Sequence, residues 1–218
     1  SVANDGEKLA ALLTCLGITQ PDGTVINATD GQIVNGLVKI KELSSGKYLK
    51  RDLTVTIDDA DEETELDITD INGNISLSNA IRNKLNQLNS GFYIEIHPIT
   101  ETMINTRDGS IFVGQVVDRP TYDKQADEPI ETVFSNVLQK GDYDNISINP
   151  LTTIKRHLFD AAGGNLTIPE ANNKVKKIFN MNDESYNNID PYKVVLSSSD
   201  DADRVKAVKV LDRISEIM

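Results

Sequence analysis

The chain has 218 residues, a formal net charge of -12 and a sequence pI near 4.6. An acidic chain repels the phosphate backbone, so nucleic acid is excluded as a partner, and anionic membrane surfaces are disfavoured for the same reason. Aromatic residues make up only 5% and tryptophan is absent, which leaves little material for an aromatic sugar-binding platform. The single cysteine, Cys15, allows neither an intrachain disulfide nor a cysteine-based zinc site.

The two ends of the chain have apolar helical patterns. Residues 1–19 predict a short helix, which could be the end of a preceding segment, and the chain stops inside a second apolar pattern at Met218. No signal peptide opens the sequence, and no apolar run is long enough to cross a bilayer. We therefore expect a fragment of a longer protein, without membrane insertion by this part.

Residues 20–125 predict a β-sandwich domain. Strands are expected over residues 33–40, 53–57, 92–96 and 111–117, with one helix at residues 80–88 between them. Asn72-Gly73 between alternating segments favours a hairpin turn. Residues 58–65 and 101–108 are expected to be long polar loops. Eight residues should contribute to the sandwich core: Leu37, Val38, Val55, Ile57, Ile94, Ile96, Phe112 and Val116.

Residues 126–218 predict a separate helical domain. A polar linker is expected at residues 119–129, followed by an apolar stripe at helical spacing over residues 130–138. Asn149-Pro150 supplies an N-cap and a first helical residue, and Pro169 opens another helix. A last helix should begin near Ser199. Seven residues should form the helical core: Ile130, Phe134, Leu138, Leu151, Leu158, Phe179 and Leu211. The predicted fold class is therefore α+β, a β-sandwich followed by a bundle of short helices.

Candidate chemistry is limited to an acidic loop and two histidines. Asp58, Asp59 and Asp61 are the candidate metal ligands, because calcium prefers oxygen donors, although a run of carboxylates on one loop is more often simply solvated. Calcium is the one cofactor that these residues suggest. Asp70 to Asn74 imitates an EF-hand start, but Ile81 occupies the position that needs a bidentate glutamate. His97 and His157 have no nucleophile beside them in sequence, and no catalytic motif is present, so we expect no enzyme.

Two sets of motifs resemble known bacterial modules. Residues 69–77, TDINGNISL, followed by GFYIEI at 91–96, resemble the hairpin and next strand of the carboxypeptidase regulatory-like sandwich, an Ig-like or prealbumin-like fold. Ile75 stands where that family usually has an aromatic residue, and residues 78–90 are an insertion. Residues 148–154, INPLTTI, are similar to a helical motif that follows such sandwiches in bacterial surface proteins and lipoproteins.

This resemblance implies export, exposure at a bacterial cell surface and a role in adhesion. The expected function is a non-catalytic binding or spacer module, with a protein or a glycan at a cell surface as its partner. Two alternatives stay open: an accessory domain of a secreted hydrolase, and a structural module stiffened by calcium.

Overall fold

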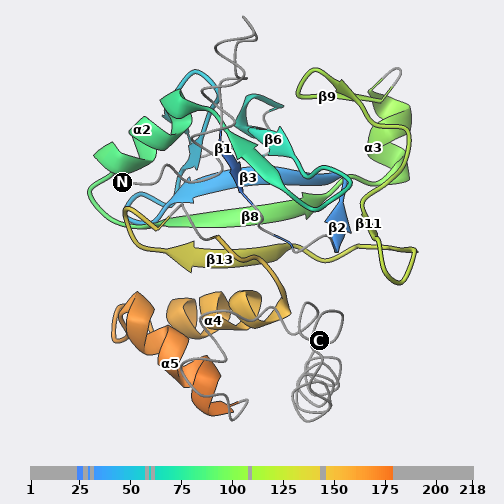
Figure 1. The fold of residues 1–218 in the computed structure, drawn as a ribbon. Coiled ribbons are helices and arrows are strands. Elements are labelled where there is room, and N and C mark those ends of the chain that lie inside the picture. Colours follow the sequence, from blue (N-terminus) through green and yellow to red (C-terminus); the bar gives the residue numbers. More distant parts are fainter. Residues whose placement is uncertain are drawn as a thin grey trace, which may run out of the picture.

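Figure 1 shows the computed structural model of the chain, an α+β protein of several antiparallel sheets and short helices. The structure describes residues 24–26, 29, 32–56, 59, 62–107, 110–142 and 146–178. The predicted helices over residues 1–19 and from Ser199 onward lie outside these residues. So do Ile57, Phe179 and Leu211 of the two predicted cores.

A six-stranded antiparallel sheet forms the centre of the molecule, with the strand order β13-β8-β3-β4-β5 and with β6 also paired to β3. Its strands are β3 (Gly36–Glu42), β4 (Tyr48–Leu49), β5 (Val55–Thr56), β6 (Asp67–Ile68), β8 (Phe92–Pro98) and β13 (Phe134–Leu138). β3 and β8 pair along their whole lengths, from Gly36 opposite Pro98 to Glu42 opposite Phe92. The alternating patterns over residues 33–40 and 92–96 are thus confirmed as strands.

The described residues also form three smaller sheets around this central sheet. β1 (Thr24–Ile26) pairs with β7 (Ile75–Leu77), and β9 (Ile111–Phe112) pairs with β10 (Gln115–Val116). The third sheet joins β2 (Ile33–Val34), β11 (Tyr122–Asp123) and β12 (Glu128–Pro129). The linker predicted at residues 119–129 is therefore wrong, because this segment carries two paired strands.

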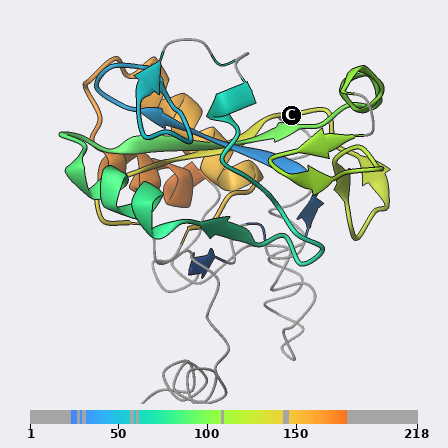
Figure 2. The same cartoon turned by 90° about the horizontal axis from the view of Figure 1, so that it is seen from above.

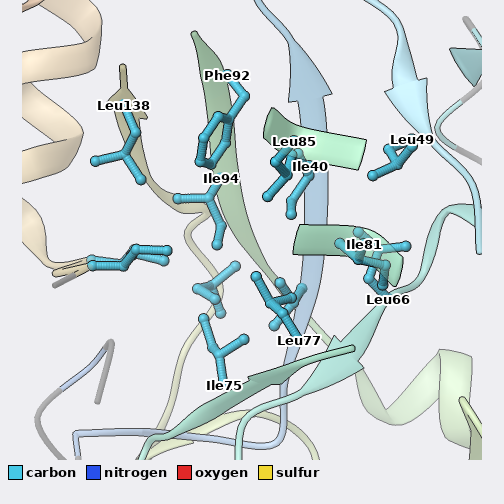
Figure 3. Close-up of a cluster of buried hydrophobic side chains, with 14 of the residues drawn as sticks. Ile40, Leu49, Leu66, Ile75, Leu77, Ile81, Leu85, Phe92, Ile94 and Leu138 are labelled. Atoms are coloured by element: carbon cyan, nitrogen blue, oxygen red, sulfur yellow. The ribbon is translucent and has the colours of Figure 1, made fainter. Parts of the chain in front are cut away.

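The main core lies between one side of the central sheet and the helix α2 (Asn79–Gln87), as Figure 3 shows. Val38 and Ile40 of β3 point to this side together with Ile94 and Ile96 of β8, and we call it the apolar face. Ile81 and Leu85 of α2 pack against them, along with Ile75 and Leu77 of β7. Ser78 begins α2 by accepting a hydrogen bond from the Ile81 amide at 3.2 Å, and α2 confirms the helix predicted over residues 80–88.

A smaller core lies on the opposite side of the sheet, beneath α3 (Glu101–Thr106) and the β9–β10 hairpin. It consists of Leu37, Ile68, Ile99, Phe112 and Val117, with Met103, Ile104 and Val113 packed against it. Both views place α3 and β9 at one end of the molecule (Figures 1 and 2). Val116 was expected in a core, but it is 75% exposed, whereas its neighbour Val117 is buried.

The helix predicted over residues 130–138 is wrong, since β13 occupies its second half. Phe134 and Leu138 pair with β8 and pack into the main core, where Ile130 joins them. The expectation of two separate cores therefore fails for these three residues. The central sheet also extends past residue 126, where the helical domain was predicted to begin. Residues 134–138 form a strand because β8 provides partners for their backbone groups, although their apolar residues also fit helical spacing.

Among the described residues, two helices follow β13, where the helices at Pro150 and Pro169 were predicted. They are α4 (Pro150–Ala161), which lies beside β13 in Figure 1, and α5 (Ile168–Ile178), which packs against α4. Asn149 caps α4 with a capping box, in which its side chain and that of Thr152 each accept from the other residue's amide. Leu151 is buried as expected, and Leu158 is partly buried.

The motif glycines have local explanations. Gly73 adopts a φ of 70° in the turn between Asp70 and Asn74, so the turn at Asn72-Gly73 is confirmed. The flanking strands, however, do not form the expected hairpin ladder, because β6 pairs with β3 and β7 pairs with β1. A Cβ on Gly91 would lie 2.1 Å from the carbonyl oxygen of Leu138, so only glycine allows β13 to approach there.

Candidate functional site

Of the three predicted metal ligands in the acidic loop, the structure describes one. Asp58 and Asp61 lie outside them, and Asp59 is exposed. The ammonium group of Lys39 donates a hydrogen bond to the carbonyl oxygen of Asp59, which places a positive charge beside the loop. Within the described ranges, no three His, Cys, Asp or Glu side chains are grouped to hold a metal ion. Calcium binding by Asp58, Asp59 and Asp61 stays a prediction.

A polar cluster lies on the side of the central sheet opposite the apolar face. Lys39 of β3, Glu95 of β8 and Ser135 of β13 form one cross-strand row, with Tyr93 and His97 two residues away on β8. We call this side the polar face. The alternation of β8 directs Phe92, Ile94 and Ile96 into the main core and leaves the polar residues between them on the polar face.

Glu95 is the centre of the cluster and is 4% exposed. Its Oε1 accepts a hydrogen bond from the Tyr48 hydroxyl at 2.6 Å and lies 2.9 Å from Nε2 of His97. Its Oε2 accepts from the guanidinium group of Arg156, which reaches the sheet from α4. Both carboxylate oxygens are therefore engaged by residues from three separate elements.

These partners stabilise the ionised form of Glu95. Burial by itself raises the pKa of Glu95, but hydrogen bonds from His97, Arg156 and Tyr48 outweigh it and lower the pKa to about 2. Burial and the hydrogen bond to Glu95 raise the pKa of Tyr48 above its ordinary value. Glu95 is thus ionised and Tyr48 neutral throughout the physiological range, which makes this carboxylate a poor general acid and this phenol a poor nucleophile.

The same cluster attaches α4 to the sheet. The Arg156 guanidinium stacks over the Tyr93 ring at 4.2 Å from its centroid, and its Nε lies 3.3 Å from Asp160 Oδ2. The Tyr93 hydroxyl donates to Asp160 Oδ1 at 2.7 Å. Arg156 therefore joins Glu95, Tyr93 and Asp160 in one network, whose geometry is that of a structural connection between helix and sheet.

The structure brings His97 and Glu95 together but leaves the other sequence candidates apart. His157 is exposed on α4, as expected. The alternation of Tyr93, Glu95 and His97 on a strand could have indicated a shared polar face, whereas the contribution of Arg156 had no local signal. Arg156 lies 61 positions from Glu95 in the chain, and only the packing of α4 brings it there.

A second candidate site is the surface formed by α3, β9 and β10. Residues 101–108 were predicted to be a loop, but Glu101 to Thr106 form a helix, which Thr100 begins by accepting from the Met103 amide. Thr100 thus acts as an N-cap that the loop interpretation overlooked. Next to this helix in Figure 2, the β9–β10 hairpin leaves Ile111 and Val116 55% and 75% exposed. We call α3 with the hairpin the α3–β10 surface.

No family model matches the chain, and the searches of curated proteins and of solved structures likewise find no match. The resemblance to the carboxypeptidase regulatory-like sandwich therefore stays a prediction. Among the described helices, none is both long and apolar enough to cross a membrane.

Proposed function

We propose that the chain is a non-catalytic binding module of an exported bacterial surface protein or lipoprotein, and that it binds through the α3–β10 surface. The observation that carries this proposal is the exposed apolar pair of Ile111 and Val116. These residues face each other across the hairpin and lie on the same side of it. Adjacent apolar side chains that remain exposed on a folded domain are typical of protein contact sites.

The polar face supports the non-catalytic part of this proposal. The carboxylate of Glu95 already accepts hydrogen bonds from three side chains of the protein, so it has little capacity left to bind a substrate. The lack of tryptophan makes a glycan a less suitable partner than a protein. The proposed cell-surface location and the Ig-like or prealbumin-like nature of the sheets rest on the resemblance of residues 69–96 and 148–154.

A binding array tests the proposal. The fluorescently labelled chain is applied to immobilised extracellular-matrix proteins and glycans, in parallel with its Val116→Asp variant. We expect binding to protein spots that Val116→Asp removes, because a charge replaces an apolar contact. Ile71→Asp is the matched control, since Ile71 is 54% exposed on the turn before β7. Binding lost equally in both variants, or no binding at all, contradicts the proposal.

Assays with esterase, glycosidase and peptidase substrates test the hydrolase alternative. We expect no turnover that depends on His97. Turnover that His97→Ala abolishes and His157→Ala leaves intact would overturn the non-enzymatic interpretation, because only His97 contacts a buried carboxylate.

A further inference from the structure

Among the described residues, β10 pairs with β9 alone, so its other backbone edge, which carries Val116, has no neighbouring strand. Val116 lies opposite Ile111, and Gln115 lies opposite Phe112 across the turn at Val113 and Gly114. On the far side of the Val116–Ile111 pair, the Val117 amide donates to the Ser110 carbonyl at 2.6 Å. Hydrogen-bonded and non-hydrogen-bonded pairs alternate along an antiparallel ladder, so the N–H and C=O groups of Val116 point away from β9.

The hairpin that presents this edge packs onto the small core. Phe112 and Val117 lie in the small core, with exposed fractions of 0% and 3%, and the Arg107 guanidinium stacks 4.1 Å from the centroid of the Phe112 ring. Val113 adopts a φ of 48°, a conformation that a β-branched residue rarely takes. Packing of Val113 against the small core holds this turn. The turn places Ile111 and Val116 outward while Phe112 and Val117 point inward.

We propose that an extended segment of a partner protein adds as a strand to the open edge of β10, with its backbone bonded to Val116. Adding a strand to an open edge uses backbone hydrogen bonds for affinity and side-chain contacts for specificity. Here the apolar contact is the exposed pair of Ile111 and Val116, which an apolar side chain of the partner covers. This inference rests on the proposed function and specifies its partner and its manner of binding.

Charge decides between a partner protein and a second copy of this chain. Two copies would each carry a net charge of -12 over the whole chain, and Asp118, which is exposed two residues beyond Val116, would approach another acidic chain. A segment with lysine or arginine beside its apolar residue instead complements the charge of Asp118. The partner is therefore an extended basic and apolar polypeptide segment.

A phage-displayed library of random peptides, panned against the full chain, identifies the preferred segment. We expect enriched peptides to carry an apolar residue flanked by lysine or arginine, and one of them is then synthesised for affinity measurements. Val116→Pro removes the outward N–H and should weaken binding at least tenfold, while Ile71→Asp should change it less than twofold. Val116→Thr keeps the backbone donor and should bind more tightly than Val116→Pro.

Hydrogen exchange on the unmodified chain gives an independent measurement if Val116→Pro disturbs folding. The bound peptide should slow exchange of the Val116 amide at least tenfold. Failure to enrich any peptide overturns the inference, as does an unprotected Val116 amide in the complex. If Val116→Asp removes binding on the array while the Val116 amide stays unprotected, strand addition is wrong and the proposed contact surface stands. If His97-dependent turnover is found, the proposed function fails instead.

Discussion

The apolar face and the polar cluster around Glu95, on the opposite side of the central sheet, are stabilised by different forces. On the apolar face, Val38, Ile40, Ile94 and Ile96 are at most 1% exposed and pack against α2 and β7. On the polar face, Glu95 is almost as deeply buried, yet its neighbours are donors from Tyr48, His97 and Arg156. Burial of apolar area has no directional requirement, whereas the hydrogen bonds of the polar face need each donor in place.

Two carboxylates show how far the faces differ. Asp67 lies opposite Val38 and so belongs to the apolar face, where burial raises its pKa to about 6 against weaker opposing bonds from the amides of Ser76 and Ile68. Glu95 is also buried, but its three donors lower its pKa to about 2. Burial alone therefore does not decide the charge of a carboxylate in this sheet. The number and the charge of the hydrogen-bond donors around a carboxylate decide whether it is ionised.

The largest expected effect comes from breaking the apolar face. Phe92 is fully buried in the main core (Figure 3), so Phe92→Ala should lower the free energy of unfolding by about 3–5 kcal/mol. Urea denaturation measures this loss. The exposed substitution Ile71→Ala is the control and should stay within about 0.5 kcal/mol. A loss below about 1 kcal/mol for Phe92→Ala would mean that the main core is not packed as described.

Removing the Glu95 charge from the polar face should lower the free energy of unfolding slightly less than Phe92→Ala does. Glu95→Gln removes the charge that pairs with Arg156, whose side chain is only 15% exposed, and should cost about 2–4 kcal/mol at pH 7. The depressed pKa of Glu95 contributes stability fully above about pH 4.5, and this contribution is lost as pH falls through about 2. Urea melts of both proteins should therefore converge at about pH 2.

A second substitution separates the pair from general disruption. In the double variant of Glu95→Gln and Arg156→Met, the guanidinium that has lost the Glu95 charge is also removed, so the two losses of stability should be less than additive. Additive losses in this double-mutant cycle would contradict the ion pair as the source of the effect. Glu128→Gln, at an exposed position of β12, is the control for removing a carboxylate charge.

Asp67→Asn should stabilise the protein, whereas Glu95→Gln should destabilise it. Because the folded pKa of Asp67 is raised, its ionised form costs stability above about pH 6, and this cost disappears below about pH 3.8. The neutral amide keeps an oxygen that can accept from the Ser76 amide, so a gain of about 1–3 kcal/mol is expected at pH 7. Thermal or urea melts at pH 7 and pH 3.5 should show the gain only at pH 7; destabilisation at pH 7 would contradict it.

Much of the local structure could be predicted because its signals are local. Ser78 and Asn149 cap helices by bonding to amides three residues away, and the alternating patterns of β3 and β8 identify both strands. The sequence did not predict β13, because the same apolar residues fit a helical stripe until β8 provides a partner. Hydrogen bonds to a neighbouring strand are long-range, and no pattern within residues 130–138 reports them.

The exposed pair of Ile111 and Val116 on the hairpin could not be predicted from the sequence for a different reason. A single strand over residues 111–117 would place Phe112 and Val116 on the same side. The turn at Val113 and Gly114 instead pairs Val116 with Ile111, which directs Val116 to solvent and Val117 into the small core. A shift of one residue moves a side chain to the other side of a strand. The polar cluster was missed for a related reason, since Arg156 approaches Glu95 only through the packing of α4.

The smallest expected effect concerns the outer edge of β13, where two hydroxyl groups take the place of a neighbouring strand. The Thr152 hydroxyl donates to the Ser135 carbonyl at 2.8 Å and accepts from the Asn149 amide. The Thr153 hydroxyl accepts from the Ser135 amide at 3.0 Å and donates to the Asn149 carbonyl at 2.9 Å. The two threonines of the NPLTT segment thus begin α4 and also satisfy both backbone groups of Ser135.

Thr152→Val and Thr153→Val should each cost about 1–2 kcal/mol, because valine has nearly the same shape but leaves buried backbone groups without a partner. Thr152→Ser and Thr153→Ser keep the hydroxyl groups and should recover most of this loss. Hydrogen exchange separates the two positions: only Thr153 accepts from the Ser135 amide, so Thr153→Val should accelerate exchange at Ser135 more than Thr152→Val does, even at equal stability. Equal acceleration in both variants would mean that the loss reflects fraying of the first turn of α4. A selective effect of Thr153→Val would instead establish that this edge of the sheet is closed by a side chain.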